Sequence, residues 1–326
     1  MLHATIIGTG SYVPSNVMTN EDLTKLVETS DEWIVSRTGI KERRISTGEK
    51  TSDLAYEAAY RALQSSGRKA TDIDLIICAT ITPDYFMPSV ACMVQGKLGA
   101  GRAAAYDLTA ACTGFVFALV TAAQFIETGM YTNVLVIGAD TNSKILDWKD
   151  RSTCVLFGDG AGAVVLSASE EKKGIIAADL TSDGSKHSIL VSPAVPLSNP
   201  YIQDEIESFN PSIRMQGQEV FKFAVRIVLE NIEAVLKKAD LKAEDIKYIV
   251  PHQANRRIIE HVAKCSGIPL EKFYINLDRY GNTSSGTIGI ALVEMLQDNM
   301  LQPGDKIIMV GFGGGMTSGA VLLEWN

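Results

Sequence analysis

The chain has 326 residues, of which 46% are hydrophobic and 21% are charged, and its formal net charge is −8. This composition is typical of a folded globular protein, and a chain of this length buries enough apolar surface to need neither disulfides nor a structural metal. The acidic balance argues against nucleic acid as the main partner, because phosphate binding requires clustered lysine and arginine.

The cysteines and the N-terminal residues indicate where the protein works. Five cysteines without a C-x-x-C pair are typical of reduced thiols in the cytosol. The opening residues MLHATIIGTGSYVP lack the basic and apolar regions of a signal peptide. The most apolar stretch, residues 109–126, is slightly short for a bilayer span and contains polar residues, so it is predicted to be a buried helix. We therefore expect a cytoplasmic protein without membrane contact.

Helix and strand patterns alternate along the chain. An amphipathic helix pattern over residues 53–66 precedes a short apolar strand over 72–78, and a similar pair follows at 218–238 and 246–251. Uninterrupted apolar runs such as VLVIGA and KIIMVG suit strands that helices cover on both faces. This alternation predicts an α/β fold with mainly parallel strand pairing.

Two segments of the first half recur in the second half. Residues 72–78 resemble 245–251, and 133–138 resemble 306–311, each at an offset of 173. A third segment, which ends at Cys112, matches the one that ends at Asn282 only loosely, at an offset near 170. Segments that recur in one order at nearly one offset indicate an internal duplication.

The duplication predicts two α/β halves, 1–172 and 173–326, packed around a pseudo-two-fold axis. Insertions distinguish the halves, and the segment 192–212 is rich in proline, serine and asparagine. Because it is too long for a neutral connector, we expect it to form a wall or lid of a site.

Cys112 is the candidate nucleophile. A β-type segment over residues 104–108 leads through small residues to Cys112, and an uncharged helix pattern follows, with Gly114 allowing close packing at the turn. This arrangement places the sulfur at a helix N-terminus, where we expect the helix dipole to lower the pKa of the thiol. The other four cysteines are interpreted as small core residues.

His252 and Asn282 are polar residues at the ends of two apolar patterns. His252 follows the strand at 246–251, at a carboxyl end where α/β sites gather, whereas His3, His187 and His261 are interpreted as incidental. Asn282 follows a tight turn at Gly281, and residue type alone favours a helix N-cap by Asn282 or Thr283.

Six motifs in the chain together resemble the β-ketoacyl-acyl carrier protein synthase III family, which has the thiolase fold. They are TSDEWIVSRTGI (29–40), DLTAACTGF (107–115), FGDGAGA (157–163), VPHQANRR (250–257), YGNTSSG (280–286) and GFGGGMTSG (311–319). The resemblance covers essentially the whole chain. It implies duplicated α/β halves in layers of the order αβαβα.

The resemblance also implies a reaction and its catalytic residues. The family transfers an acyl group from acyl-CoA to a cysteine and condenses it with malonyl-acyl carrier protein, releasing CO₂ and 3-oxoacyl-acyl carrier protein. The matching positions are Cys112, His252 and Asn282, with an oxyanion hole from the backbone N–H groups of Cys112 and Gly314. A neutral imidazole and an amide are suitable donors to an enolate oxygen. Neither a cofactor nor a metal is expected, since acyl-CoA is a substrate.

Substrate contacts follow from the same resemblance. The residues implied for acyl-CoA and the acyl chain are Trp33, Arg37, Met87, Arg151, Ala254, Asn255 and Phe312. Trp33 and Arg151 would hold the adenine between them, and Met87, where the family often has phenylalanine, would reach across a homodimer interface to the acyl pocket. Because methionine is adaptable, the primer could be acetyl, branched or longer.

The carrier protein is acidic, so docking on this chain requires a local basic patch. The residues expected to bind it are Lys222, Gln253, Ala254, Asn255, Arg256, Arg257 and Lys264, with Arg226 nearby.

Three other interpretations are weaker. A papain-like hydrolase would also use cysteine, histidine and asparagine, but its C-G-[SA]-C-[WY] signature is absent. A related condensing enzyme of polyketide or quinolone synthesis would use the same three residues with another starter. A thiolase-fold scaffold without activity is disfavoured because all three reactive positions are intact.

Overall fold

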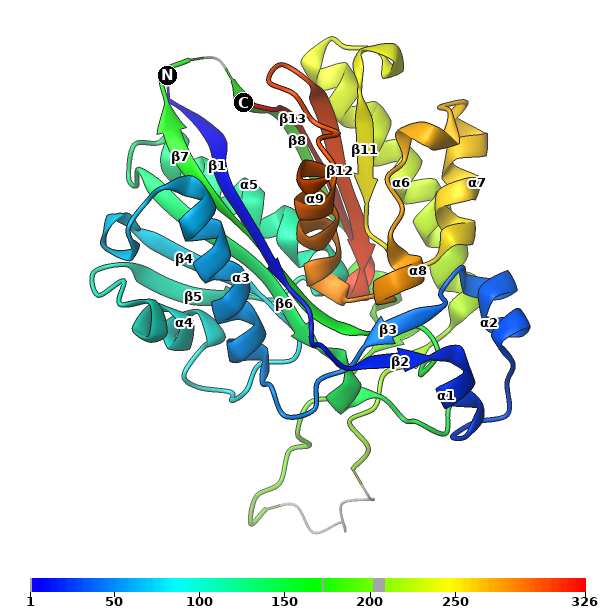
Figure 1. The fold of residues 1–326 in the computed structure, drawn as a ribbon. Helices are drawn as coiled ribbons and strands as arrows, with labels where there is room; N and C mark the ends of the chain where they lie inside the picture. Colours follow the sequence, from blue (N-terminus) through cyan, green and yellow to red (C-terminus); the bar gives the residue numbers. More distant parts are fainter. Residues whose placement is uncertain (1, 172, 202–208) are drawn as a thin grey trace.

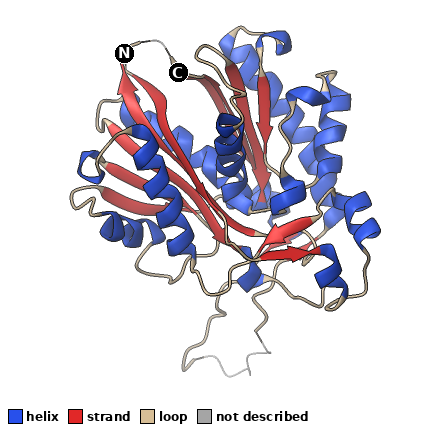
Figure 2. Cartoon of the chain, in the orientation of Figure 1, coloured by secondary structure: helices blue, strands red, loops and turns tan. Residues whose placement is uncertain are grey.

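The computed structural model describes residues 2–171, 173–201 and 209–326. Two sheets contain most of the strands, and helices lie between the sheets and on their outer faces (Figures 1 and 2). In these described ranges, no helix combines the length and apolar character needed to cross a bilayer.

The first sheet has five strands in the order β1-β7-β6-β4-β5. Their bounds are His3–Tyr12 (β1), Asp159–Ser169 (β7), Asn133–Thr141 (β6), Leu75–Ala79 (β4) and Ala104–Leu108 (β5). β4 pairs in parallel with both β5 and β6, whereas β7 is antiparallel to both β6 and β1.

The second sheet repeats this arrangement in the order β8-β13-β12-β11. Its strands are Gly174–Ser182 (β8), Thr317–Glu324 (β13), Lys306–Gly313 (β12) and Tyr248–Pro251 (β11). Only β11 and β12 pair in parallel. The prediction of mainly parallel pairing is therefore wrong, because in each half the chain returns antiparallel after β6 or β12 without a crossover helix.

Strand register confirms the repeat. Cys78 pairs with Ile137 in the first sheet, and Pro251 pairs with Val310 in the second, so both partners shift by 173 residues. The third predicted match needs a correction. The 3₁₀ turn Ala111–Thr113 corresponds to Ser284–Gly286, again at 173, so the structural counterpart of Cys112 is the residue after Ser284 and not Asn282.

Five layers follow from the packing of six helices. Their bounds are Thr51–Ser66 (α3), Val90–Leu98 (α4), Gly114–Glu127 (α5), Gly217–Ala239 (α6), Arg256–Ser266 (α7) and Thr287–Gln297 (α9). Buried side chains of α5 and α9 fill the space between the two sheets, those of α3 and α4 cover the outer face of the first, and those of α6 and α7 cover the outer face of the second. The predicted αβαβα order is confirmed.

Smaller elements lie near the carboxyl ends of the parallel strands. They are β2 (Val17–Thr19), α1 (Asn20–Thr24), α2 (Asp31–Thr38), β3 (Glu42–Arg44), β9 (Leu190–Val191), β10 (Arg214–Met215) and α8 (Leu277–Tyr280). Residue 172, at the predicted boundary between the halves, lies outside the described residues, so the division itself stays a prediction.

Two of the cysteines interpreted as core residues are not buried. Cys78 and Cys154 are buried, but Cys92 and Cys265 are exposed, because each lies on the side of its helix, α4 and α7 respectively, that is turned away from the buried residues.

Candidate active site

One cavity of about 1350 Å³ brings together the three predicted reactive side chains, Cys112, His252 and Asn282. It exceeds the usual 300–1,000 Å³ of small-molecule sites, so it has room for a long substrate. Segments of both halves line it, including Pro193–Val195 and Phe209 from the segment predicted as a wall or lid. Residues 202–208 of that segment lie outside the described residues.

Cys112 lies between β5 and α5, in a turn that the sequence pattern predicts. Ala111 has a positive φ of 49°, which turns the chain sharply before the helix. A side chain at Gly114 would come within 2.8 Å of the Ala79 side chain, so glycine allows α5 to begin directly against β4. The buried sulfur therefore lies at the N-terminal end of a buried helix whose first charged residue is Glu127, at its last position.

The predicted low pKa of Cys112 is wrong. Burial raises the pKa of the thiol to about 12, partly opposed by the Ser284 hydroxyl, while the Asp140 carboxylate raises it further. Desolvation of a buried thiolate exceeds the help that a helix N-terminus provides. The resting sulfur is therefore a thiol at neutral pH.

His252 follows β11 and is neutral. Burial lowers the pKa of its imidazole to about 3. Its backbone N–H donates to the Val310 carbonyl at 2.8 Å, and its Nδ1 lies 2.7 Å from the Thr287 hydroxyl. The same hydroxyl lies 3.1 Å from the Ser284 carbonyl. In the tautomer that carries the proton on Nε2, Thr287 donates to Nδ1. The ring meets Phe312 edge-on, with centroids 5.4 Å apart.

Asn282 is fixed by its backbone and by one side-chain atom. Its N–H donates to the Leu156 carbonyl at 2.8 Å, and its carbonyl accepts from the Gly158 N–H at 3.0 Å. Its Oδ1 accepts from the Ser284 N–H at 2.8 Å, which turns the amide Nδ2 toward the cavity as a donor. Helix α9 begins after Gly286, so the helix N-cap suggested by residue type is wrong.

The glycine turn after β12 lies against the nucleophile. A side chain at Gly313 would come within 2.7 Å of the Cys112 backbone nitrogen, and Gly315 has a φ of 75°. Gly314 and Phe312 line the cavity, as the resemblance implies. Glycine thus allows this turn to approach the Cys112 backbone closely.

Residues implied for acyl-CoA line the same cavity. They are Trp33, Arg37, Met87, Arg151, Ala254 and Asn255. The Arg151 guanidinium lies directly over the Trp33 ring, 4.7 Å from its centroid, and donates to the Glu28 carbonyl. A flat base between them would need the guanidinium to move by about one ring thickness, roughly 3.5 Å. The Asn255 side chain donates to the Arg37 carbonyl at 3.1 Å and so joins α7 to α2.

Of the residues expected to bind a carrier protein, one is misplaced. Gln253 is only 1% exposed, and its amide bonds to the carbonyls of Pro251 and Tyr274, so it offers no surface to a partner. The segment 274–276 packs against Gln253 and explains this burial. Ala254 and Asn255 are half-buried at the cavity.

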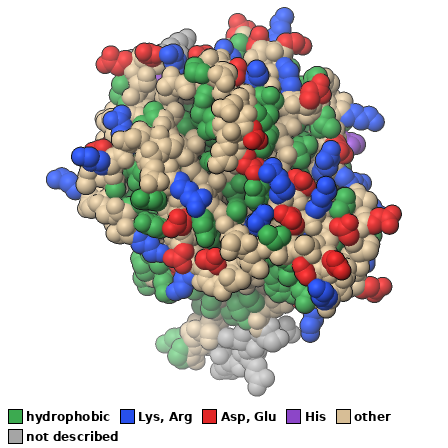
Figure 3. Space-filling model, viewed as in Figure 1, with side chains coloured by type: hydrophobic (Ala, Val, Ile, Leu, Met, Phe, Trp, Pro, Cys, Tyr) green, Lys and Arg blue, Asp and Glu red, His purple; other side chains and the backbone are tan. Residues whose placement is uncertain are grey.

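The predicted basic side chains are exposed on α6 and α7, where Figure 3 shows basic and acidic groups interspersed along that side of the molecule. Lys222 pairs with Glu219, Arg226 with Glu230 and Arg256 with Glu260. In the described part of the chain neither Arg257 nor Lys264 has an acidic partner.

Asp140, near the end of β6, was not predicted as a site residue from the sequence. Its buried carboxylate accepts hydrogen bonds from the hydroxyls of Thr80, Thr82 and Ser285, and thereby joins the first sheet to the turn after Asn282. The sequence did contain a signal for this residue, because an aspartate at the end of an apolar strand is a candidate for a buried polar group. Thr287 was also missed, and nothing in its local sequence marks it as a partner of His252.

Known proteins resemble the chain along its whole length. The family model described as 3-oxoacyl-[acyl-carrier-protein (ACP)] synthase III matches residues 106–184, and its C-terminal counterpart matches 236–325. A β-ketoacyl-[acyl-carrier-protein] synthase III of Clostridium acetobutylicum is 57% identical over 321 residues, with 98% of each chain covered.

Solved structures agree with these matches. The 3-oxoacyl-[acyl-carrier-protein] synthase III of Aquifex aeolicus has a TM-score of 0.93 at 48% identity, with 99% of this chain and 100% of the other covered. The priming β-ketosynthase of the R1128 polyketide pathway has a TM-score of 0.92 at 32% identity, with 99% of this chain and 96% of the other covered.

Proposed function

This chain belongs to the 3-oxoacyl-[acyl-carrier-protein] synthase III family, and on this premise we propose that it starts fatty acid synthesis by condensing an acyl-CoA primer with malonyl-acyl carrier protein. The products are 3-oxoacyl-acyl carrier protein, CoA and CO₂. The observation that carries the proposal is the convergence of Cys112, His252 and Asn282 on one cavity.

In the first half-reaction the Cys112 sulfur attacks the thioester carbonyl of acyl-CoA. The S–C bond to the enzyme forms, the bond to the CoA sulfur breaks, and the cysteine proton ends on the released CoA. The backbone N–H groups of Cys112 and Gly314 are the proposed donors to the oxyanion. Such donors act on charge that develops only in the transition state.

In the second half-reaction malonyl-acyl carrier protein loses CO₂. The electron pair of the broken C–C bond forms an enolate whose oxygen accepts hydrogen bonds from His252 Nε2–H and Asn282 Nδ2–H. The neutral state of His252 supports this role. A neutral donor stabilises the ground state less than a full positive charge would, so its effect is larger on the transition state. The carbanion then attacks the acyl carbonyl on Cys112. The new C–C bond forms, the bond from the carbonyl carbon to the Cys112 sulfur breaks, and the released thiolate takes a proton from water to restore the thiol.

The cavity mouth supports binding of CoA by Trp33, Arg37 and Arg151. The Arg151 guanidinium moves away from the Trp33 indole so that the adenine can enter between them. The cation–π contact between the two side chains is then replaced by stacking of each side chain on one face of the adenine. No separate cofactor or metal takes part in this scheme, and the protein acts in the cytoplasm.

A homodimer is part of the proposal. Phe86 and Met87 are 82% and 85% exposed on a loop at the rim of the cavity. Two neighbouring apolar side chains this exposed are better accommodated when a second copy covers them. Met87 of one copy then reaches the acyl pocket of the other.

A related condensing enzyme with another starter is the second candidate, and the similarity to the R1128 priming synthase favours it. One steady-state comparison of acetyl-, isobutyryl- and octanoyl-CoA, with malonyl-acyl carrier protein and product identification, separates the two. A 3-oxoacyl-acyl carrier protein from a short or branched primer supports priming of fatty acids. CoA release only with some other starter supports the second candidate, and no CoA release from any acyl-CoA contradicts both.

A further inference from the structure

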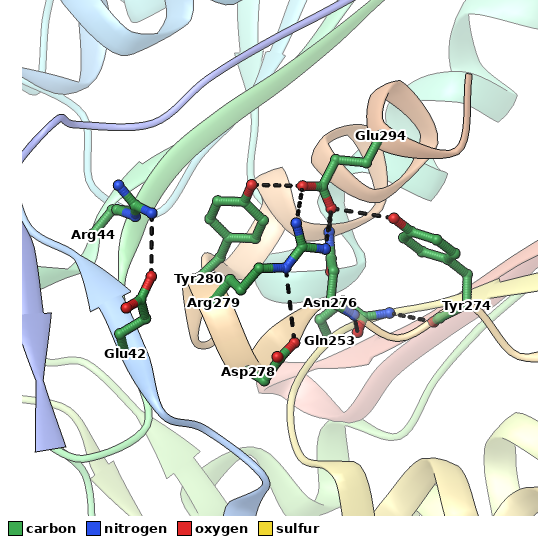
Figure 4. A network of polar contacts seen from close by, with 9 residues as sticks. All are labelled: Glu42, Arg44, Gln253, Tyr274, Asn276, Asp278, Arg279, Tyr280 and Glu294. Carbon is green, nitrogen blue, oxygen red and sulfur yellow. Dashed lines mark hydrogen bonds and ion pairs between the residues drawn. The ribbon is translucent and has the colours of Figure 1, made fainter. Parts of the chain in front are cut away.

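The Glu294 carboxylate on α9 is buried outside the cavity and accepts an unusual number of hydrogen bonds. Its two oxygens receive five, from the hydroxyls of Tyr280 (2.6 Å) and Tyr274 (3.3 Å), the Asn276 amide (2.7 Å) and both terminal nitrogens of Arg279 (2.8 and 3.0 Å). Figure 4 shows these side chains converging on Glu294. A carboxylate has about four lone-pair sites, so its accepting capacity is fully used.

All four donors belong to the segment 274–280, which ends two residues before Asn282. Tyr280 is followed by Gly281, whose φ of 63° and ψ of −158° are favourable only for glycine. A side chain there would come within 2.9 Å of the Leu156 carbonyl. The backbone position of Asn282 thus depends on how this segment is held.

The same segment is bonded to the neighbour of His252. Gln253 donates to the Tyr274 carbonyl at 3.0 Å and accepts from the Asn276 N–H at 3.1 Å (Figure 4). On the other side, Thr287 holds the His252 ring. Thr287 and Glu294 are seven residues apart on α9, which places them on one face of the helix.

A closed set of contacts therefore connects both proposed enolate donors to α9, and Cys112 meets this set through the Ser284 hydroxyl rather than through the segment 274–280. Burial raises the pKa of Tyr280 to about 12 and the Glu294 carboxylate adds to this, so the phenol remains a donor. Burial lowers the pKa of Arg279, but Glu294, Tyr280 and Tyr274 together raise it by more, so the guanidinium remains charged.

We propose that Glu294 is a positioning residue for the decarboxylation step: by anchoring the segment 274–280 it holds Asn282 and His252 at the distance from each other that the enolate requires. The inference rests on the proposed function. Misplacement of a catalytic group by about 1 Å costs on the order of 100-fold in rate, whereas acylation of Cys112 does not use this anchor.

The test measures both half-reactions separately in single turnover. CoA release from acetyl-CoA reports acylation, and CO₂ release from malonyl-acyl carrier protein reports decarboxylation. For Glu294→Gln we expect CO₂ release to fall about 10- to 100-fold with an unchanged KM for the carrier protein, and acylation to stay within about 2-fold. Tyr280→Phe, which removes one bond and keeps the packing, is expected to lower CO₂ release about 5-fold.

The matched control is Glu324→Gln, which removes a partly buried carboxylate paired with Lys306 in the same half, and we expect both rates to be unchanged. Equal losses in both half-reactions, or unchanged CO₂ release in a folded Glu294→Gln protein, overturn the inference. If Glu294→Gln does not fold, Tyr280→Phe decides by the same criteria. Absence of CoA release from the unaltered protein overturns the proposed function instead.

Discussion

The two halves of the molecule use the same turn for different purposes. The 3₁₀ turn before α5 and the one before α9 each begin with a non-glycine residue of positive φ, Ala111 (49°) and Ser284 (52°). The next residue is Cys112 in the first half, which faces the cavity, and Ser285 in the second, whose hydroxyl is bonded to Asp140 and to the Ala79 carbonyl. The first turn presents the proposed nucleophile, and the second is held by hydrogen bonds beside the residues proposed as donors.

This difference teaches that a duplicated scaffold can divide one reaction between its halves. In the proposed scheme the first half supplies the acyl acceptor, and the second supplies His252 and Asn282. Changes in one half should therefore affect one half-reaction more than the other, and the following predictions test that separation.

The largest effect is expected from Cys112→Ala. Condensation should fall by at least about 10⁴-fold, because no other group at that position can carry the acyl chain. CO₂ release from malonyl-acyl carrier protein should persist, since both donors are intact. Loss of acylation and CO₂ release together would contradict the division between the halves.

Thr287→Val should damage only the second half-reaction. Without the hydroxyl on Nδ1 the imidazole is no longer held as the Nε2–H tautomer, and groups that orient a functional histidine are typically worth 10- to 100-fold. We expect CO₂ release to fall about 10-fold or more in single turnover, with acylation unchanged. Thr287→Ser keeps the donor and is the matched control; a loss as large as that of the valine variant would show that the hydroxyl is not responsible.

The pH dependence of alkylation tests the state of the nucleophile. Only the thiolate reacts, and burial raises the pKa of Cys112 to about 12. The rate at which iodoacetamide modifies Cys112 should therefore rise about tenfold per pH unit between about pH 7 and 10. Peptide mapping measures the modification of Cys112 separately from that of the other cysteines. Asp140→Asn removes a charge that raises this pKa, so it should speed modification at each pH. A rate that levels off near neutral pH would contradict the burial argument.

The smallest effect concerns docking of the carrier protein. Arg257→Glu should raise the KM for malonyl-acyl carrier protein about 5- to 10-fold at low salt and leave acylation by acyl-CoA nearly intact. Arg256→Glu should have a smaller effect, because that guanidinium is already paired with Glu260 at 2.8 Å. Equal loss in both half-reactions would count against a docking role.

Much of the fold could be predicted from the sequence, because it depends on patterns among residues that are close in the chain or that repeat along it. Buried strands, amphipathic helices and the 173-residue repeat are local or periodic, and the strand–turn–helix context of Cys112 was visible in the same way. Antiparallel pairing of β7 and β13 was not, since a continuous apolar run does not indicate strand direction.

The sequence was enough to predict which residues form the site, but not their burial, pKa values or hydrogen-bond partners. The pKa of Cys112 depends on how completely its surroundings exclude water, and the burial of Gln253 depends on the segment 274–276, which packs against it from a distance in sequence. The partner of Nδ1 on His252 comes from another helix. Such long-range contacts leave no local signal.

The account is tested most directly by the two half-reactions of His252→Ala and Asn282→Ala. Each variant should acylate Cys112 to the same extent as the unaltered protein, while CO₂ release falls by about 100- to 1,000-fold, as expected for loss of one oxyanion donor. If either variant instead fails to accept the acyl group, or releases CO₂ at the unaltered rate, the second half of the molecule does not have the role assigned to it.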